Sequence, residues 1–245
     1  MKDIPGYITF IKIQPIDFGI CSGGAEVYTL LSWVEGNDCE IVLPKLRKNQ
    51  QYDLGIEAGR ILKKIHTIPA PKAQESWESQ FSRIIDNKIN SCKDCPIKFS
   101  GDEVLIDYIN ENRCLLKDRP QYFHHSDYHV GNMILSDEGR LSVIDFNRFN
   151  YGDPWEEFNR IVWCYSCSRE FAAGRVGGYL NSDVPLDFWK LLALFISSNT
   201  LSSIYWAIPF GSSEVEVMLK QAEGVLLQYN NMANVIPKWY RKVIL

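Results

Sequence analysis

Residues 124–134, HHSDYHVGNMI, place three histidines, one aspartate and one asparagine within eleven positions. Side chains of these types could bind a transition metal, activate a nucleophile, or hold magnesium on a phosphate. A zinc hydrolase needs further imidazole or thiolate ligands, but the chain has only four histidines and none follows His129. A nucleophilic triad is assembled in space and not from consecutive residues, and the chain has no G-x-S-x-G sequence. Magnesium on phosphate fits best, because magnesium takes few protein ligands and prefers oxygen.

Two short apolar runs follow the histidine-rich segment and predict a β-hairpin. NMILS and LSVID flank DEGR, whose Gly139 suits a turn. Antiparallel pairing about a centre between residues 138 and 139 places Asn132 opposite Asp145, so an amide oxygen and a carboxylate could bind one cation. The segment SDYHV just upstream returns Asp127 to the same end of the hairpin, where its carboxylate could accept the proton of an attacking hydroxyl.

At these residues the chain resembles the aminoglycoside phosphotransferase family, whose members are relatives of the eukaryotic-like kinases. HHSDYHVGNMIL is similar to the catalytic loop of that family, VIDFNRFNYGDPWEEF to its magnesium-binding segment, and GIEAGRILKKIHTIPAP to an early helix. The resemblance implies that Asp127 is the catalytic base, that His125 supports the loop, and that Asn132 and Asp145 hold Mg²⁺. Arg148 is similar to an arginine that the family places near the transferred phosphate.

LLSWVEG resembles the hinge between the two lobes of such enzymes, which implies that the backbone of Ser32, Trp33 and Val34 meets the base of ATP or GTP. Family members act on hydroxyl groups of small molecules, including aminoglycosides, other antibiotics and metabolites. The resemblance therefore implies an ATP-dependent phosphotransferase with a small-molecule hydroxyl acceptor. His129 and Glu157 are candidate contacts for that acceptor, although a loop hydrogen bond for the histidine and a helix N-terminus for the glutamate explain them as well.

The same resemblance implies an α+β, protein-kinase-like fold. Residues 1–36 would be the remaining part of an N-terminal β lobe with the hinge, and residues 37–245 a mostly helical lobe that carries the catalytic β-hairpin. Only 31 residues precede Ser32. In them we do not find the combination of a glycine-rich loop, a strand lysine and a helix glutamate that anchors phosphates in kinases. The small lobe is therefore expected to be truncated.

A catalytically inactive binding or scaffold protein, and a shortened form of a longer enzyme, stay open as alternatives. The exposed edge of a truncated sheet favours a homodimer that covers it.

Hydrophobic periodicity predicts where the strands and helices lie. A period of two residues indicates strands, and an apolar stripe repeating every three or four residues indicates helices. Strands are expected at 7–13, 26–34 and 121–125, and helices at 52–66, 74–90, 102–116, 155–170, 186–207 and 213–232.

The composition argues against two classes of partner. The net charge is −4 and no basic run is longer than LRK, so nucleic-acid binding is not expected. No apolar run approaches the length that spans a bilayer, and the N-terminus lacks the regions of a signal peptide, so we expect a cytoplasmic protein without a membrane partner.

Two CxxC spacings, Cys92/Cys95 and Cys164/Cys167, are explained better by small buried thiols than by zinc.

Overall fold

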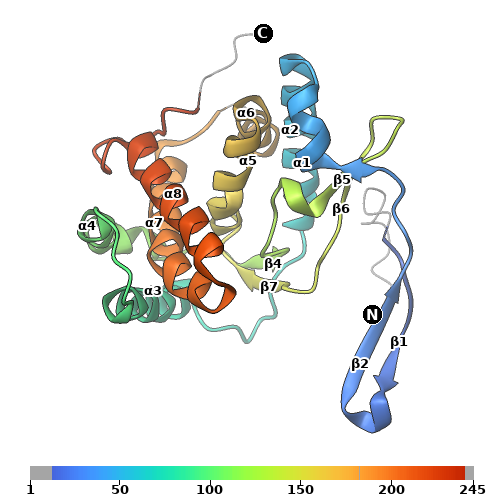
Figure 1. The fold of residues 1–245 in the computed structure, drawn as a ribbon, viewed down its shortest axis with the longest axis horizontal. Coiled ribbons are helices and arrows are strands. Elements are labelled where there is room, and N and C mark those ends of the chain that lie inside the picture. The colour runs from blue at the N-terminus through green and yellow to red at the C-terminus, as the bar shows by residue number, and fades with distance from the viewer. Residues whose placement is uncertain (1–12, 182, 241–245) are drawn as a thin grey trace.

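The computed structural model describes residues 13–181 and 183–240, which form a helical body with small sheets and a projecting hairpin (Figure 1). Within these residues the strands and helices are β1 (Pro15–Cys21), β2 (Glu26–Leu31), β3 (Asn37–Asp38), α1 (Cys39–Val42), α2 (Lys48–Ile65), α3 (Trp77–Asp94), α4 (Asp102–Asn112), β4 (Tyr122–His124), β5 (Met133–Leu135), β6 (Leu141–Val143), β7 (Asn150–Gly152), α5 (Ile161–Cys167), α6 (Arg169–Leu180), α7 (Leu186–Ala207) and α8 (Ser212–Tyr229). Two 3-10 turns border the site described below, η4 (Val130–Asn132) and η5 (Glu156–Arg160). The arrangement is α+β, as expected.

The strands of the described residues form three small antiparallel sheets, β1–β2, β3–β5–β6 and β4–β7. Strands β4, β5 and β6 lie where the sequence predicted them, around the histidine-rich segment. Strand β1 and the short strands β3 and β7 were not predicted. The expected strand at 7–13 falls almost entirely outside the described residues, and the strand expected at 26–34 ends at Leu31.

The β5–β6 hairpin has a different register from the predicted one. Met133 pairs with Val143, and the backbone oxygen of Asn132 accepts a hydrogen bond of 3.0 Å from the N–H of Ile144. The predicted pairing of Asn132 with Asp145 is therefore wrong by one residue. Asp145 follows directly after the pair, at the open end of the hairpin.

The turn of this hairpin explains the shift in register. Gly139 has a φ of 75°, and the N–H of Ser136 donates to the carbonyl oxygen of Arg140 at 3.0 Å. These two features define a three-residue loop that ends in a left-handed glycine. The predicted pairing had placed Arg140 in the loop, which moved the centre of the hairpin by half a residue.

Helices α2 and α6 cross at a contact made of glycines. Gly55 and Gly59 on α2 face Gly174 and Gly178 on α6, and the members of each pair are four residues apart, on one side of their helix. A Cβ atom added at Gly174 would overlap the carbonyl oxygen of Tyr52. The backbones of α2 and α6 are therefore in direct contact, and this contact fixes the position of α6. The sequence had predicted one helix over 155–170 and had not predicted α6.

The β1–β2 hairpin projects away from the helical body (Figure 1). Ile20 pairs with Val27 and Phe18 with Thr29, so these side chains share one face of the hairpin. Phe18, Ile20 and Val27 are 72%, 73% and 82% exposed. An isolated two-stranded hairpin is marginally stable in water, and this one presents an apolar face that no described residue covers.

One helical segment of the described residues, Leu186–Phe210, is long and apolar enough to cross a membrane. This corrects the expectation that no segment approaches that length. Of its most apolar window, 67% is buried inside the fold, where α7 packs against α3, α4 and α8. A core helix with this environment is apolar because it is surrounded by protein.

Candidate active site

Strand β4 leads into a loop, residues 125–129, whose backbone is held by one buried carboxylate. Glu157 in η5 accepts hydrogen bonds from the N–H of His125 at 2.8 Å and from the N–H of Ser126 at 2.6 Å. Ser126 has a φ of 68°, a left-handed conformation that is uncommon for residues with a side chain. Because Glu157 is only 1% exposed, it holds this unfavourable backbone conformation from the interior of the protein.

The burial of Glu157 contradicts its expected contact with an acceptor. Its carboxylate also lies 3.4 Å from Nε2 of His66, whose Nδ1 is 2.8 Å from the hydroxyl of Tyr179. Burial alone would raise the pKa of Glu157, but the hydrogen bond from His66 and the neighbouring imidazoles of His124 and His125 lower it to about 2. Burial lowers the pKa of His66. The pair is therefore a carboxylate with a neutral imidazole that donates from Nε2.

Arg175 on α6 supports the same loop from a second direction. Its guanidinium is fully buried and donates hydrogen bonds to the carbonyl oxygens of Tyr128 at 2.9 Å and Glu157 at 3.1 Å. It also lies over the rings of Tyr128 and Phe158, at 4.7 and 4.6 Å from their centroids. The Tyr128 hydroxyl donates to the carbonyl oxygen of Ala58 on α2 at 2.7 Å. The loop is thus attached to both helices of the glycine contact.

His125 connects the loop to the end of β6. Its Nδ1 accepts a hydrogen bond of 3.2 Å from the N–H of Asp127, and its Nε2 lies 2.8 Å from the carbonyl oxygen of Ile144. A backbone N–H only donates and a carbonyl only accepts, so the neutral ring carries its proton on Nε2. Burial lowers the pKa of His125, which favours the same neutral form. This geometry suits the supporting role that the resemblance implied.

Three nitrogen atoms surround the carboxylate of Asp127, whose side chain is 17% exposed. Nε of Arg160 lies 3.3 Å from Oδ1, Nε2 of His129 lies 3.6 Å from Oδ1, and a terminal nitrogen of Arg148 lies 3.8 Å from Oδ2. Burial alone would raise the pKa of Asp127, but the nearby imidazole of His129 and the charges of Arg160 and Arg148 lower it to about 2. Asp127 is therefore ionised at neutral pH.

His129 lies beside Asp127, on the side of the loop that faces α5. Its Nδ1 accepts a hydrogen bond of 3.1 Å from the N–H of Gly131, so the ring presents an Nε2–H group to Asp127. Its ring centroid lies 6.2 Å from that of Trp163 on α5. His129 is thus a neutral hydrogen-bond donor at the carboxylate, in a position that an acceptor could contact.

The two predicted metal ligands lie at the open end of the hairpin. The side-chain nitrogen of Asn132 donates to the carbonyl oxygen of Asp127 at 2.9 Å. Asp145 is exposed and has a φ of 65°, so the chain turns sharply there. Within the part of the chain that the structure describes, no three His, Cys, Asp or Glu side chains are grouped to hold a metal ion. A cation at Asn132 and Asp145 would therefore take its remaining ligands from phosphates and water.

Comparison with known proteins decides the family. A model of the phosphotransferase enzyme family matches residues 12–190. The chain belongs to the phosphotransferase enzyme family. No curated protein matches the chain.

Solved structures of similar fold agree with this assignment. A mutant of aminoglycoside 2'-phosphotransferase-IIIa in complex with GDP has a TM-score of 0.66 at 14% identity, over 93% of this chain and 79% of that one. A thermostable mutant of aminoglycoside phosphotransferase APH(4)-Ia in complex with ADP and hygromycin B has a TM-score of 0.66 at 15% identity, with the same shares of 93% and 79%. A choline/ethanolamine kinase family protein from Mesorhizobium loti has a TM-score of 0.64 at 10% identity, over 89% and 74%. At these identities the likeness shows the protein-kinase-like fold.

In this phosphotransferase family member, the expected hinge continues from β2. The N–H of Ser32 donates to the carbonyl oxygen of Gln14 at 2.8 Å, and the Ser32 hydroxyl accepts from the N–H of Gln14 at 2.8 Å. Trp33 is 83% exposed and Val34 is half-buried. The N–H and hydroxyl of Ser32 are therefore both bonded to Gln14, and a contact of Ser32, Trp33 and Val34 with a nucleotide base stays a prediction. The expected truncation of the small lobe stays a prediction.

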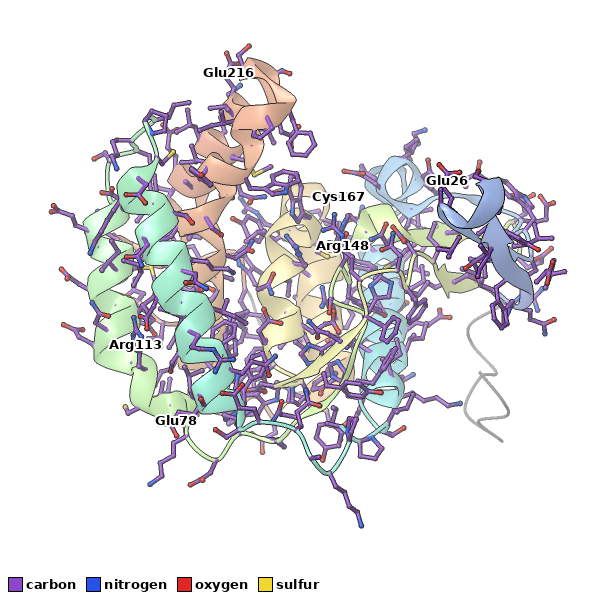
Figure 2. All side chains as sticks on the ribbon, turned by 90° about the horizontal axis from the view of Figure 1, so that it is seen from below. Glu26, Glu78, Arg113, Arg148, Cys167 and Glu216 are labelled. Atoms are coloured by element: carbon purple, nitrogen blue, oxygen red, sulfur yellow. The ribbon has the colours of Figure 1, made fainter. Side chains whose placement is uncertain are left out.

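The sequence did not single out Arg160 and Arg175 as residues of the site. Each is a charged residue within a mostly apolar stretch, FNRIVW and AAGRVGG. Such an isolated charge in an apolar helix was the available signal, because a buried or half-buried guanidinium needs partners. Arg148, which was predicted, lies well away from Arg113 (Figure 2). Arg113 is on the side of the molecule formed by α3 and α4.

Proposed function

We propose that this family member transfers the terminal phosphoryl group of ATP or GTP to a hydroxyl group of a small molecule. The observation that carries the proposal is the ionised carboxylate of Asp127, in a loop whose Asp127 backbone carbonyl accepts a hydrogen bond from the Asn132 side chain next to the hairpin. A carboxylate there can accept the hydroxyl proton while the hydroxyl oxygen bonds to phosphorus and the bond to the leaving diphosphate breaks. Complexes of similar structures with GDP and ADP support a nucleotide donor.

The donor atoms of the hairpin end fit magnesium. Because the amide nitrogen of Asn132 donates to the carbonyl oxygen of Asp127, the amide oxygen stays available for a cation. Asp145 adds an exposed carboxylate. A magnesium ion held by these two residues would neutralise phosphate charge. Arg148, 56% exposed and 3.8 Å from Asp127, adds a positive charge on the side where the transferred group would lie.

A second candidate function is a binding or scaffold protein without catalysis. Residues 13–44 contain no lysine, so strands β1, β2 and β3 do not carry the phosphate-anchoring strand lysine of kinases. That lysine and its loop contribute to both nucleotide affinity and rate, since phosphoryl transfer depends on positioning and charge stabilisation.

A calorimetric titration with ATP, in Mg²⁺ and in EDTA, separates the two functions. We expect magnesium-dependent binding that Asp145→Ala removes. Asp127→Asn should leave ATP bound and lower phosphate transfer by about 10²–10⁴-fold. Binding with no transfer to any of a panel of hydroxyl compounds would favour the scaffold function. No magnesium-dependent binding of ATP would contradict the phosphotransferase. Arg113→Gln, remote from the site and ion-paired with Asp86 at 2.7 Å, is the matched control.

A further inference from the structure

Two guanidinium groups lie near the carboxylate of Asp127. Arg160 and Arg148 both lie within ion-pair distance of the carboxylate, at 3.3 and 3.8 Å, while His129 is a neutral donor. Arg148 lies on the hairpin side, where the transferred phosphoryl group is proposed to bind. Arg160 lies at the junction of η5 and α5 and is closest to Oδ1 of Asp127, whereas Arg148 is closest to Oδ2. One arginine is thus left for the molecule that brings the hydroxyl.

Arg160 lacks the hydrogen bonds that a mostly buried guanidinium needs. Its side chain is 25% exposed, and its Nε is buried without a hydrogen-bond partner among the residues that the structure describes. The 3.3 Å contact with Asp127 is a charge contact whose geometry does not make a hydrogen bond. Buried donors in native proteins are normally paired, with protein, water or a ligand. An arginine offers a planar fork of five donors that matches the oxygens of a carboxylate or phosphate.

Glu156 does not satisfy Arg160, although the two interact electrostatically. One carboxylate oxygen of Glu156 accepts a hydrogen bond of 2.7 Å from Asn159, and the other lies 3.7 Å from Nδ1 of His124. Lys88 on α3 also interacts with Glu156. Glu156 therefore interacts with both Lys88 and Arg160 but supplies no hydrogen bond to the Arg160 guanidinium.

Arg160 directly precedes helix α5, on which Trp163 lies. Arg160 and Trp163 are three residues apart and so share one side of the helix. The indole of Trp163 is half-buried and lies against the ring of His129. An acceptor with its hydroxyl at Asp127 would meet the His129 and Trp163 rings and the Arg160 guanidinium.

We propose that the acceptor carries an anionic oxygen group, a carboxylate or a phosphate ester, close to the hydroxyl that is phosphorylated, and that Arg160 binds this group. The inference rests on the proposed phosphotransferase function and names its substrate class. A polycation such as an aminoglycoside would place ammonium groups beside two arginines, and like charges at such distances repel strongly in a partly buried site. An anion supplies the hydrogen-bond partners that Arg160 lacks.

The test uses small hydroxyl compounds that differ mainly in charge. The protein saturated with Mg²⁺ and ADP is titrated calorimetrically with glycerate, glycerol 3-phosphate, glycerol, choline and kanamycin. We expect glycerate or glycerol 3-phosphate to bind about tenfold or more tightly than glycerol, because a charge-assisted hydrogen bond is gained. The two anions distinguish a carboxylate site from a phosphate site. Choline and kanamycin should bind no better than glycerol.

Variants of Arg160 assign the preference to this residue. Arg160→Gln should remove the difference between anion and glycerol without changing the affinity for Mg²⁺ and ADP, and Arg160→Lys should keep part of it. Arg113→Gln, with a side chain 27% exposed and remote from the site, should change nothing. The inference is overturned if a cation binds as tightly as the anions, if Arg160→Gln keeps the preference, or if no anion binds at millimolar concentration while the nucleotide does. If the nucleotide fails to bind, the proposed function itself fails, and the inference fails with it.

Discussion

Replacing Glu157 with glutamine tests whether one buried carboxylate holds the catalytic loop. The carboxylate accepts from the N–H groups of His125 at 2.8 Å and Ser126 at 2.6 Å. Glutamine keeps the shape but offers one oxygen and one NH₂ group, so one of the two backbone N–H groups would face another donor. An unsatisfied buried donor costs about 1–3 kcal/mol, and the bond that remains loses its charge assistance. We therefore expect Glu157→Gln to lower the free energy of unfolding by roughly 3 kcal/mol.

The pKa of Glu157 gives a second estimate of the same quantity. A carboxyl group lowered from 4.5 to about 2 in the folded state is stabilised by about 3 kcal/mol at neutral pH. Because the folded-state pKa is the lower one, this stabilisation is complete above the unfolded value of 4.5 and disappears as the pH falls toward 2. The difference in stability between the wild type and Glu157→Gln should therefore be largest at pH 7 and fall to less than about half by pH 3.

Urea unfolding of both proteins between pH 7 and pH 3 measures this difference in the free energy of unfolding. In a separate thermal melt at pH 7, the melting temperature of the variant should be lower by roughly 6–12 °C, given about 2–4 °C per kcal/mol for a chain of this length. Glu78→Gln, an exposed glutamate on α3 (Figure 2), is the control and should change little. A stability difference that stays constant with pH would refute the argument, because the charge of Glu157 would then not be its cause. Unchanged stability would refute the proposed attachment of the loop.

Three further predictions concern the helix contact, the base and the hairpin. Gly174→Ala should destabilise the fold by about 3 kcal/mol in a melting experiment, because its Cβ would overlap the Tyr52 carbonyl oxygen. Gly224→Ala on α8 is the control. Its Cβ would lie 3.8 Å from the nearest atom, so this change should be neutral or stabilising. The imidazole of His129 and the neighbouring arginines outweigh burial and lower the pKa of Asp127 to about 2. Asp127 should therefore stay ionised, and the rate of phosphate transfer should not fall through its protonation between pH 7 and 5. A fall in rate over that range that is caused by Asp127 would contradict this. We propose that a second copy covers the apolar hairpin face, whose Phe18, Ile20 and Val27 side chains are 72%, 73% and 82% exposed. Phe18→Ser should then sediment as a monomer, whereas the wild type should sediment as a dimer. The proposal is contradicted if the wild type is a monomer, or if deleting residues 1–12 alone dissociates the dimer.

The sequence predicted the location of the hairpin that follows Asp127 but not its register. The order of aspartate, asparagine and a strand ending in Asp145 was sufficient to expect a hairpin with oxygen ligands at its end. The register depended on whether Gly139 ends a loop of three residues or lies inside one of four, and only the left-handed φ decides this. A shift of one residue changes which side chains face each other, so such a detail matters for a metal site.

Helix α6 shows why other parts of the fold were not predicted. Its sequence contains three glycines, REFAAGRVGGYL, and glycine is unfavourable in an isolated helix by about 1 kcal/mol per residue. The helix exists because Gly174 and Gly178 pack against α2, and a contact between segments more than a hundred residues apart leaves no local signal. Arg175 offered one local signal, a lone charge in an apolar stretch, but its partners Tyr128 and Glu157 lie on other elements and could not be identified from the sequence.

The short segment η5 links the support of the loop to the chemistry proposed in front of it. Glu157 and Arg160 are three residues apart in η5, and both contact the same loop. Glu157 binds the backbone of residues 125 and 126 from the interior, and Arg160 lies 3.3 Å from the carboxylate of Asp127. A displacement of η5 would therefore change the position of the base and of the anion-binding guanidinium together. For this reason Glu157→Gln should weaken the anion preference attributed to Arg160 as well as stability, whereas Arg160→Gln should alter acceptor binding without the pH-dependent loss of stability.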